Sequence, residues 1–511
     1  MSDPHCETLP ADVSKADRRA WIGLAALAVP AFIYAMDLTV LHLAVPQIAQ
    51  GLKPSSAQLL WIVDIYGFMV AGTLIIMGTL GDRIGRRLVL MVGAAAFGLT
   101  SLIAAFAWSA EVLIGARALQ GLAAATLAPS TLSLLRNMFH DEHERRFAVG
   151  VWIACFSVGG AIGPVIGGAI LSQFWWGAVF LINVPIMLAL ILIGPFVLPE
   201  FRDPNARRID VFGAAQSLAA VLLIIYGVKR IAESGAAGLD LLAIALGVGI
   251  AIMFFRRQAR LADPLVDVKL FRNSMFSTAL VMNIINPFII IGAFLFIAQY
   301  FQLVLGMGPL EAGLWLAPSG LIFALGSLAA ARLVRAFSSA TVVTAGFLVT
   351  AVGLLILTGT GAAKGPGLVF AGLVVLSAGI APVGTITTDF ILGIAPPERA
   401  GAASALSETS FELGAALGIA VLGSIVTALY RGAMQAAALE GFSASEISDA
   451  LDTLGGAVAV AKVTAGEHGG LLLDAAREAF VFAFAVSSGV SVLLAVFAAA
   501  LAAAFMRGGG R

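Results

Sequence analysis

Apolar stretches of membrane-spanning length recur along the whole chain and are separated by short polar breaks. A helix rises about 1.5 Å per residue, so about 20 apolar residues cross the hydrocarbon core of a bilayer. The pattern predicts fourteen spans: 21–48, 58–80, 88–108, 110–134, 147–171, 175–198, 211–229, 239–255, 274–305, 310–334, 341–360, 366–390, 401–429 and 478–505. We therefore expect an all-α integral membrane protein, with the least certain boundary at the polar break 229–240.

Composition supports this fold class and excludes others. Of 511 residues, 60% are hydrophobic and 12% are charged, and the net charge is zero. This balance leaves no sizeable soluble domain and gives no reason to expect a nucleic-acid partner. The two cysteines, Cys6 and Cys155, predict neither a disulfide framework nor a metal site. The polar residues 1–20 and the long apolar run after them indicate an uncleaved first span.

The positive charges predict an orientation. Lys and Arg are concentrated in connections on the N-terminal side, chiefly 81–88 and 140–146. The positive-inside rule then places both termini in the cytoplasm of a bacterial-type inner membrane. The segment 430–477 falls outside, and its residues predict short amphipathic helices. It is either a solvated connector or a cap over the external mouth.

Charged residues inside the predicted spans require a partner or a function, because each costs about 2.5–3.5 kcal/mol to insert. These residues are Asp37, Asp64, Arg117, Glu408 and Glu412. Helical rise places the first three in the outer half of the membrane, Asp37 about 24 Å and the other two about 10 Å into their helices. We expect a cluster in which Arg117 neutralises one carboxylate while the other takes up a proton. The alternative is a purely structural ion pair.

Glu408 and Glu412 are four residues apart and share one helix face, about 10 and 16 Å from the helix start. Two carboxylates on one face repel each other unless one is protonated or a cation lies between them. The pair suits a proton, a substrate cation, or the exchange of the two. The alternative is a neutral pair that is hydrogen-bonded within the bundle. We expect Asp389 at the membrane interface and His42 in the core.

Four motifs resemble those of one known family. They are MDLTVLHLAVP (36–46), GDRIGRR (81–87), RALQGLAAATLAPS (117–130) and GGAIGPVIGG (159–168). In these spans and this order they resemble the major facilitator superfamily, and within it the fourteen-span drug:proton antiporters. The similarity extends over nearly the whole chain to quaternary-ammonium multidrug efflux pumps of the QacA and SmvA type.

The resemblance implies a fold of two six-helix bundles with an inserted pair of helices. The expected parts are an N-terminal tail 1–20, a bundle 21–198, an inserted pair 199–273 with its loops, and a second bundle 274–511. Alternating access would rock the bundles about a cavity at the midplane. We expect a monomer that needs no cofactor and is driven by the proton gradient.

The resemblance also assigns roles to two motifs. In the gating loop, the glycines permit a tight turn, Asp82 pairs across the cytoplasmic seam or caps a helix, and the arginines contact the anionic surface. The gating-loop residues are Gly81, Asp82, Arg83, Gly85, Arg86 and Arg87. In the antiporter motif, small residues allow close helix packing and the proline bends the helix. These residues are Gly159, Gly163, Pro164, Gly167 and Gly168. Ordinary packing of small residues is the alternative.

The expected function is proton-coupled export of lipophilic cations such as quaternary-ammonium compounds, dyes and antiseptics. Span 320–331 has no acid, which favours monovalent cargo. Glu408 and Glu412 would hold the cargo, and protons would bind Asp37 or Asp64. The candidate aromatic contacts are Phe288, Phe294, Phe296 and Trp315. One alternative is export of a neutral or anionic natural product. Another is a membrane enzyme or sensor, but we find no catalytic or metal constellation.

Overall fold

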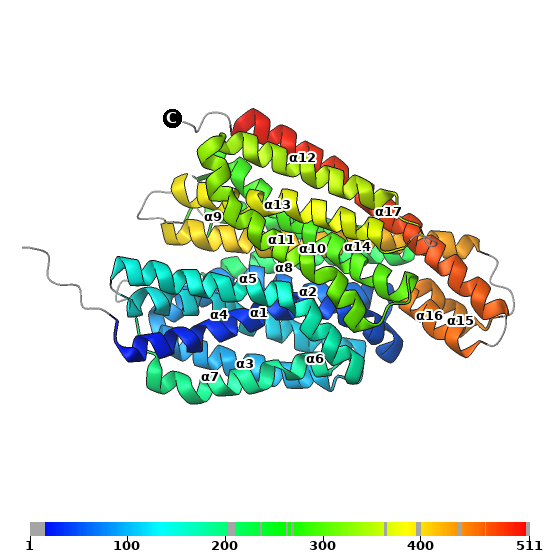
Figure 1. Cartoon of the computed structure of the whole chain (residues 1–511), viewed down its shortest axis with the longest axis horizontal. Coiled ribbons are helices and arrows are strands. Elements are labelled where there is room, and N and C mark those ends of the chain that lie inside the picture. Colours follow the sequence, from blue (N-terminus) through cyan, green and yellow to red (C-terminus); the bar gives the residue numbers. More distant parts are fainter. Residues whose placement is uncertain are drawn as a thin grey trace, which may run out of the picture.

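The structure is a computed structural model, and it confirms the prediction of fourteen spans. Within its described residues, fourteen helices are long and apolar enough to cross a membrane. The described residues are 16–139, 141–202, 210–235, 238–261, 264–266, 270–361, 365–394, 400–437, 442–464 and 467–506. The helices run roughly side by side along the long axis of the molecule (Figure 1).

The first bundle contains six spans, which begin where the sequence supplies caps. Asp17 accepts a hydrogen bond from the backbone of Ala20, and Ser55 forms a capping box with Gln58. The helices are α1 (Arg18–Leu52), α2 (Ser56–Ile84), α3 (Arg86–Ala105), α4 (Ala110–Met138), α5 (Glu142–Gln173), α6 (Ala178–Leu181) and α7 (Asn183–Val197).

The sixth span is broken, whereas the apolar pattern predicted one continuous helix over 175–198. It consists of α6 and α7, which meet at Ile182. Pro185 has no backbone N–H for the carbonyl of Leu181, so one helical hydrogen bond is missing at this point. The break places the amide of Asn183 in the buried interior of the bundle.

The second bundle also contains six spans. Its first span ends in a short π-helical turn, η2 (Tyr300–Val304), and follows a 3₁₀ turn, η1 (Leu270–Arg272). Its helices are α10 (Ser274–Gln299), α11 (Pro309–Ala336), α12 (Ser339–Thr358), α13 (Gly367–Ile394), α14 (Ala400–Ala436) and α17 (Glu467–Phe505).

An inserted helix pair lies against both bundles. The pair is α8 (Val211–Ser234) and α9 (Gly238–Gln258). Helix α8 packs on α2 and α14, and α9 packs on α8. Asp210 caps the start of α8 and accepts two hydrogen bonds from Arg257 at the end of α9. Arg257 holds the pKa of Asp210 below its usual range.

The seventh span is longer than predicted. The apolar pattern ended it at residue 229, but α8 continues to Ser234 and ends at Gly235, whose φ of 80° suits glycine. Lys229 therefore lies inside the span, with only 1% of its surface exposed. Lys229 is therefore a charged residue within a span, and the sequence did not predict it there.

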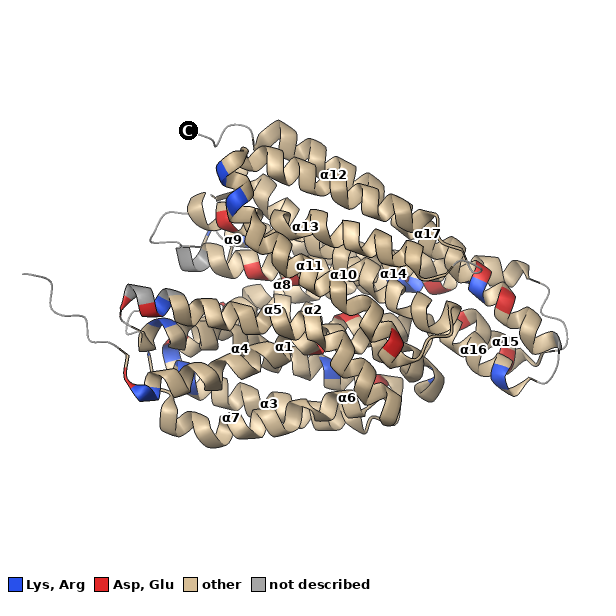
Figure 2. Cartoon of the chain, in the orientation of Figure 1, with Lys and Arg blue, Asp and Glu red and all other residues tan. Residues whose placement is uncertain are grey.

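The two ends of the bundles differ. We call the end at which α1 begins and α17 ends the terminal side, and the opposite end the cap side. Charged residues gather near both ends, with few between them (Figure 2). On the cap side, α15 (Ala444–Asp452) and α16 (Leu454–Val463) connect α14 to α17. The prediction of short helices between residues 430 and 477 is confirmed.

The segment α15–α16 is a cap rather than a free connector, because it contacts both bundles. Helix α16 packs against α1 and α17, and Leu454 and Val460 are buried. Ser56 of α2 donates a hydrogen bond to the carbonyl oxygen of Asp452, and Lys53 pairs with Asp449 at 3.0 Å.

The contacts between the two bundles lie near the midplane and in the cap-side half. A side chain added at Gly313 or Gly320 of α11 would collide with Pro164 or Ala161 of α5. Gln302 donates a hydrogen bond to the carbonyl oxygen of Leu43 at 3.1 Å. These contacts join the two bundles at the midplane and on the cap side.

Candidate functional site

A buried ion pair joins α1 to α4. Arg117 Nη1 lies 2.7 Å from Asp37 Oδ2, and the two side chains are 2% and 5% exposed. The other carboxylate oxygen, Oδ1, accepts a hydrogen bond from Asn183 Nδ2 at 3.1 Å. The predicted association of Asp37 with Arg117 is thus present, and both carboxylate oxygens have donors.

Uncharged polar residues extend this pair into a network within the first bundle. Arg117 Nη1 donates to Gln120 at 2.9 Å, and Gln120 donates to Ser101 at 2.9 Å. The guanidinium lies 4.3 Å from the ring centroid of Tyr66. The sequence analysis missed Ser101, Gln120 and Asn183, although Gln120 lies three residues after Arg117 and so shares its helix face.

Asp64 lies in a different pair from the one predicted. We expected Asp64 in a cluster with Asp37 and Arg117, but its carboxylate lies 2.7 Å from Lys229 Nζ of α8. Both side chains are at most 1% exposed. Lys229 Nζ also lies 3.7 Å from the ring centroid of Trp61. The prediction missed Lys229 because it lies at the edge of the polar break that was taken as a loop.

Glu412 is buried, and none of the cationic side chains that the structure describes pairs with it. Tyr34 of α1 donates a hydrogen bond to Glu412 Oε1 at 2.6 Å, and 1% of Glu412 is exposed. Among the described residues, no Lys, Arg or His lies within ion-pair distance of Glu412. Glu408, one turn closer to the terminal side, is exposed. The predicted pair thus consists of one accessible and one enclosed carboxylate.

Aromatic rings surround the Tyr34–Glu412 contact on the side of the first bundle. The ring of Tyr34 lies 6.3 Å from Tyr66 and 5.9 Å from Phe156. Phe156 stacks on Trp152 at 6.1 Å. We call Tyr34, Tyr66, Trp152 and Phe156 the aromatic cluster. Such faces attract cations, so the cluster is a further candidate contact for a cation beside Glu412.

The four aromatic residues predicted as cargo contacts lie on α10 and α11 and pack within the second bundle or against α1. Phe296 packs between Phe480 and Phe484 of α17, and Trp315 packs on Phe301 and Phe370. These two belong to the packing of the second bundle.

The other two predicted aromatic residues lie on α10. Phe294 meets the ring of His42 of α1 at 5.8 Å, and Phe288 is partly buried, with its backbone close to Gly418 of α14. His42 is 1% exposed, as expected for a core residue. Asp389 is exposed, in keeping with an interfacial position.

The gating loop is held within the first bundle. Asp82 pairs with Arg86 at 2.6 Å, which is neither of the two predicted roles. Arg87 Nη1 donates to the carbonyl oxygen of Leu198 at 3.0 Å, and its guanidinium lies 3.7 Å from Glu200.

Only one glycine of the gating loop lies in the turn. Gly85 has a φ of 124°, which confirms its turn role, whereas Gly81 lies within α2 beside the side chain of Arg86. Arg83 is exposed.

The antiporter motif packs α5 against α1 around Asp37. A side chain at Gly159 would collide with the backbone of Phe32, and Gly163 and Gly167 lie against Met36, Thr39 and Val40. Gly168 lies against the backbone of Pro309 in α11, and Gly313 of α11 lies against the Pro164 carbonyl. The motif therefore fixes the position of the helix that carries Asp37 and also joins the two bundles.

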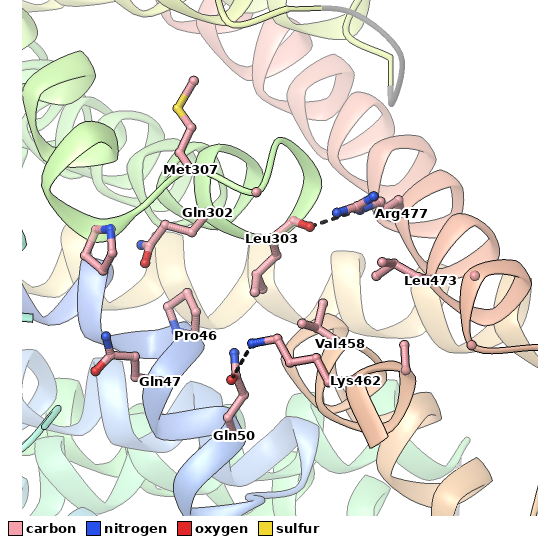
Figure 3. A pocket seen from close by; sticks show the side chains of 15 residues that line it. Pro46, Gln47, Gln50, Gln302, Leu303, Met307, Val458, Lys462, Leu473 and Arg477 are labelled. Atoms are coloured by element: carbon pink, nitrogen blue, oxygen red, sulfur yellow. Dashed lines mark hydrogen bonds between the residues drawn. The ribbon is translucent and has the colours of Figure 1, made fainter. Parts of the chain in front are cut away.

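A cavity of about 480 Å³ lies on the cap side, between α1, the turn after η2, α16 and α17 (Figure 3). Lys462 donates a hydrogen bond to Gln50 at 3.4 Å, and Arg477 donates to the carbonyl oxygen of Leu303 at 3.1 Å. Its lining includes Lys462 and Arg477 and no carboxylate.

Metal chemistry finds no support in this part of the chain. Among the described residues, no group of three His, Cys, Asp or Glu side chains could hold a metal ion. The sites are built from ion pairs, hydrogen bonds and aromatic faces.

Comparisons with known proteins agree with this architecture. The family model of the Major Facilitator Superfamily matches residues 27–419. The multidrug efflux pump LfrA of Mycolicibacterium smegmatis is 41% identical, over 94% of this chain and 95% of the pump. The methyl viologen resistance protein SmvA of Salmonella typhimurium is 35% identical, over 93% and 96%.

Two further comparisons bear on substrate and fold. The tetracenomycin C resistance and export protein of Streptomyces glaucescens is 32% identical, over 95% of this chain and 91% of that protein. A bacterial homologue of the lysosomal transporter Spinster, solved in an inward-facing conformation, has a TM-score of 0.66 at 17% identity, over 96% of this chain and 98% of that chain. At that identity the likeness concerns the fold.

Proposed function

Because the chain belongs to the major facilitator superfamily, and within it to the drug efflux pumps, we propose that it is a proton-coupled antiporter for lipophilic cations. Membership of this superfamily makes it a multi-pass membrane transporter and not an enzyme. The proposed cargo is mainly monovalent and of the quaternary-ammonium type, including dyes and antiseptics.

The observation that carries this proposal is the uncompensated carboxylate of Glu412. It is buried beside the aromatic cluster, and its hydrogen-bond partner is the neutral hydroxyl of Tyr34. A buried carboxylate without a counter-ion is costly, so it binds either a proton or a cation. Glu408, exposed on the terminal side, provides a first contact on the path to it. Cargo and proton would compete for the same oxygens, as exchange requires.

Helix α1 supplies the physical link between cargo and the second proton site. Tyr34 contacts Glu412, and Asp37, one turn further along the same helix, pairs with Arg117. Protonation of Asp37 would leave Arg117 without its counter-ion and change the contacts that position α1. Movement of α1 would then alter the Tyr34–Glu412 contact. We assign Asp37 and Arg117 to proton coupling on this basis.

The proposed orientation places the terminal side in the cytoplasm of a bacterial plasma membrane. The excess of Lys and Arg in the connections on that side supports it. With this orientation, contacts on the cap side close the outer path, and the exposed Glu408 faces the cytoplasm. The structure would then be the inward-facing state, ready to load cargo. We propose that the working unit is the monomer.

The experiment is dye export by proteoliposomes that contain purified protein under an imposed pH gradient. We expect the wild type to move ethidium when the gradient is present, and the Glu408→Gln, Glu412→Gln double variant to lose this activity. Glu446→Gln, on α15 at the cap side, keeps the hydrogen-bonding capacity that the residue uses in the capping box with Ser443, so it is the matched control and should export normally. Undiminished export by the double variant would exclude the proposed cargo site.

A second candidate function is export of an uncharged natural product, favoured by the 32% identity to the tetracenomycin C export protein. Methyl viologen, in the name of another relative, is by contrast a quaternary dication. Export assays with ethidium, methyl viologen and an uncharged polyketide distinguish cation export from export of an uncharged natural product. The cation proposal predicts that monovalent ethidium moves faster than the dication methyl viologen and that Glu412→Gln abolishes ethidium transport. Export of the polyketide alone would favour the second candidate.

A further inference from the structure

The surroundings of Lys229 contain the two components of a binding site for an organic cation. Its ammonium nitrogen lies 2.7 Å from Asp64 Oδ2, 2.8 Å from Asp64 Oδ1 and 3.7 Å from the ring centroid of Trp61. A carboxylate supplies the opposite charge, and the face of an indole is the strongest aromatic attraction for a cation. Trp61 and Asp64 lie three residues apart on α2, and so on one face.

This site lies where the bundles must move. Helix α8 packs on α2 of the first bundle and α14 of the second. Phe68 of α2, Ile225 of α8, and Ala416 and Ala420 of α14 form one apolar cluster there. Alternating access requires α2 and α14 to shift relative to each other. An ion pair that crosses from α8 to α2 beside this cluster is therefore placed to respond to that shift.

We propose that Asp64 and Trp61 form a second subsite for lipophilic cations, and that Lys229 is its resident occupant, which cargo displaces. This inference rests on the proposed function, because it extends the same cation export to a site on the inserted helix. The lysine ammonium occupies the position that a cargo cation would take. The inserted pair thereby takes part in transport, because α8 carries the lysine that occupies the subsite.

The exchange balances in charge and protons. When a cargo cation pairs with Asp64, the ammonium of Lys229 loses its counter-ion at a buried position. A buried charge without a partner is costly, so the N–H bond breaks and the proton leaves to water on the loading side. On the release side a proton returns to the neutral amine, and the new ammonium displaces cargo from the carboxylate. One cation leaves for each proton that enters.

The other charged groups described on α8 and α14 have partners other than Lys229 or are exposed. Next to Lys229 on α8, Arg230 pairs with Glu233 at 2.9 Å and lies 4.0 Å from Asp240 of α9. On α14, Glu412 accepts the hydrogen bond from Tyr34, and Glu408 is exposed. Within the described chain, Asp64 is the carboxylate in ion-pair contact with Lys229. The protonation of Lys229 is therefore coupled first to the occupancy of Asp64.

The test is calorimetric titration of purified protein with tetraphenylphosphonium in two buffers that differ in ionisation enthalpy, which gives the protons released per cation bound. Lys229→Met removes the occupant and should bind the cation about tenfold more tightly, a difference of about 1.4 kcal/mol, with about one proton fewer released. Lys229→Arg keeps the charge but has no releasable proton. It should bind no more tightly than wild type, also with about one proton fewer. Lys53→Met, on the exposed cap side, is the control and should behave as wild type.

The outcomes separate this inference from the proposed function. If both Lys229 variants release as many protons as wild type, the subsite is overturned, even when the wild type binds and exports cations. If Lys229→Met fails to fold, Lys229→Arg still decides, because a wild-type proton count in that variant contradicts the exchange. A wild type that neither binds tetraphenylphosphonium nor exports ethidium would instead contradict the proposed function itself.

Discussion

Two buried carboxylates, Asp37 on α1 and Glu412 on α14, differ in how their charge is balanced. Asp37 is paired with Arg117 and also bonded to Asn183, so both oxygens are satisfied within the first bundle. Glu412 belongs to the second bundle and meets only the neutral hydroxyl of Tyr34 among the described residues. The first site is internally neutral, whereas the second needs a proton or a cation from elsewhere. This difference is the reason why we propose Glu412, and not Asp37, as the carboxylate that holds cargo.

Removal of Arg117 should give the largest loss of stability. Arg117→Met leaves Asp37 buried with Asn183 as its only donor, and breaking a buried pair costs about 3–5 kcal/mol. Thermal unfolding in detergent should show this loss. The double variant Asp37→Asn, Arg117→Met should recover most of it, because no charge remains unpaired, yet should not recover transport. If Arg117→Met is as stable as wild type, Asp37 does not depend on Arg117 for the balance of its charge.

Neutralising Glu412 should affect binding rather than stability. Glu412→Gln keeps an acceptor for Tyr34 and removes a charge that has no partner, so we expect little change in unfolding temperature. Cation binding should weaken at least about tenfold, since a desolvated charge pair with cargo is lost. Tyr34→Phe removes one hydrogen bond and should cost about 1 kcal/mol. Fluorescence titration with ethidium measures the cation affinity of both variants. An unchanged affinity in Glu412→Gln would show that Glu412 does not bind the cation.

The packing that holds α1 near both carboxylates can be tested with adjacent glycines. Gly159→Val would collide with the backbone of Phe32, while nothing lies within 4 Å of a Cβ added at Gly160. Overpacking of this kind costs about 1–3 kcal/mol. We expect Gly159→Val to lower the unfolding temperature and slow export, and Gly160→Val to do neither. Equal effects of the two would show that helix propensity, rather than contact with α1, is responsible.

The smallest expected effect is at the base of the inserted pair. Because Arg257 lowers the pKa of Asp210, the contribution of Asp210 to stability is present above its unfolded pKa of about 3.9 and is lost as the pH falls through its lower folded pKa. Asp210→Asn should cost about 1 kcal/mol at neutral pH. Unfolding temperatures from pH 3 to 7 should converge for the two proteins at the acidic end. A constant gap would mean that charge is not involved.

The sequence allowed most of the fold to be predicted because hydrocarbon thickness dictates helix length. Fourteen spans, and the presence of short helices in the connection before the last span, could be predicted from apolar length and local pattern. The break between α6 and α7 was missed, since its cause is one proline in an otherwise uniform apolar run. Residue 229 was treated as a boundary because a lysine ordinarily ends a span. The tertiary contacts with Asp64 and Trp61 make that lysine tolerable within the membrane, and they cannot be read from the local sequence.

The charged residues of the site could be predicted from the sequence, but most of their partners could not. Charges in apolar runs can be seen in a sequence, and the Asp37–Arg117 pair was found in this way. Helical depth gives position along the membrane normal but not which helices are neighbours. Asp64 was therefore given the wrong partner. The aromatic residues beside Glu412 were missed because aromatic rings are ordinary core residues until their contacts are known.

The most direct test of the central claim is to compare two transport modes in the same proteoliposomes. Cargo–cargo counterflow of ethidium needs the cargo site alone, whereas accumulation under a pH gradient also needs the proton site. We predict that Asp37→Asn retains counterflow but loses gradient-driven accumulation, and that Glu412→Gln loses both. Counterflow that survives in Glu412→Gln, or disappears in Asp37→Asn alone, would contradict the division of roles between the two carboxylates.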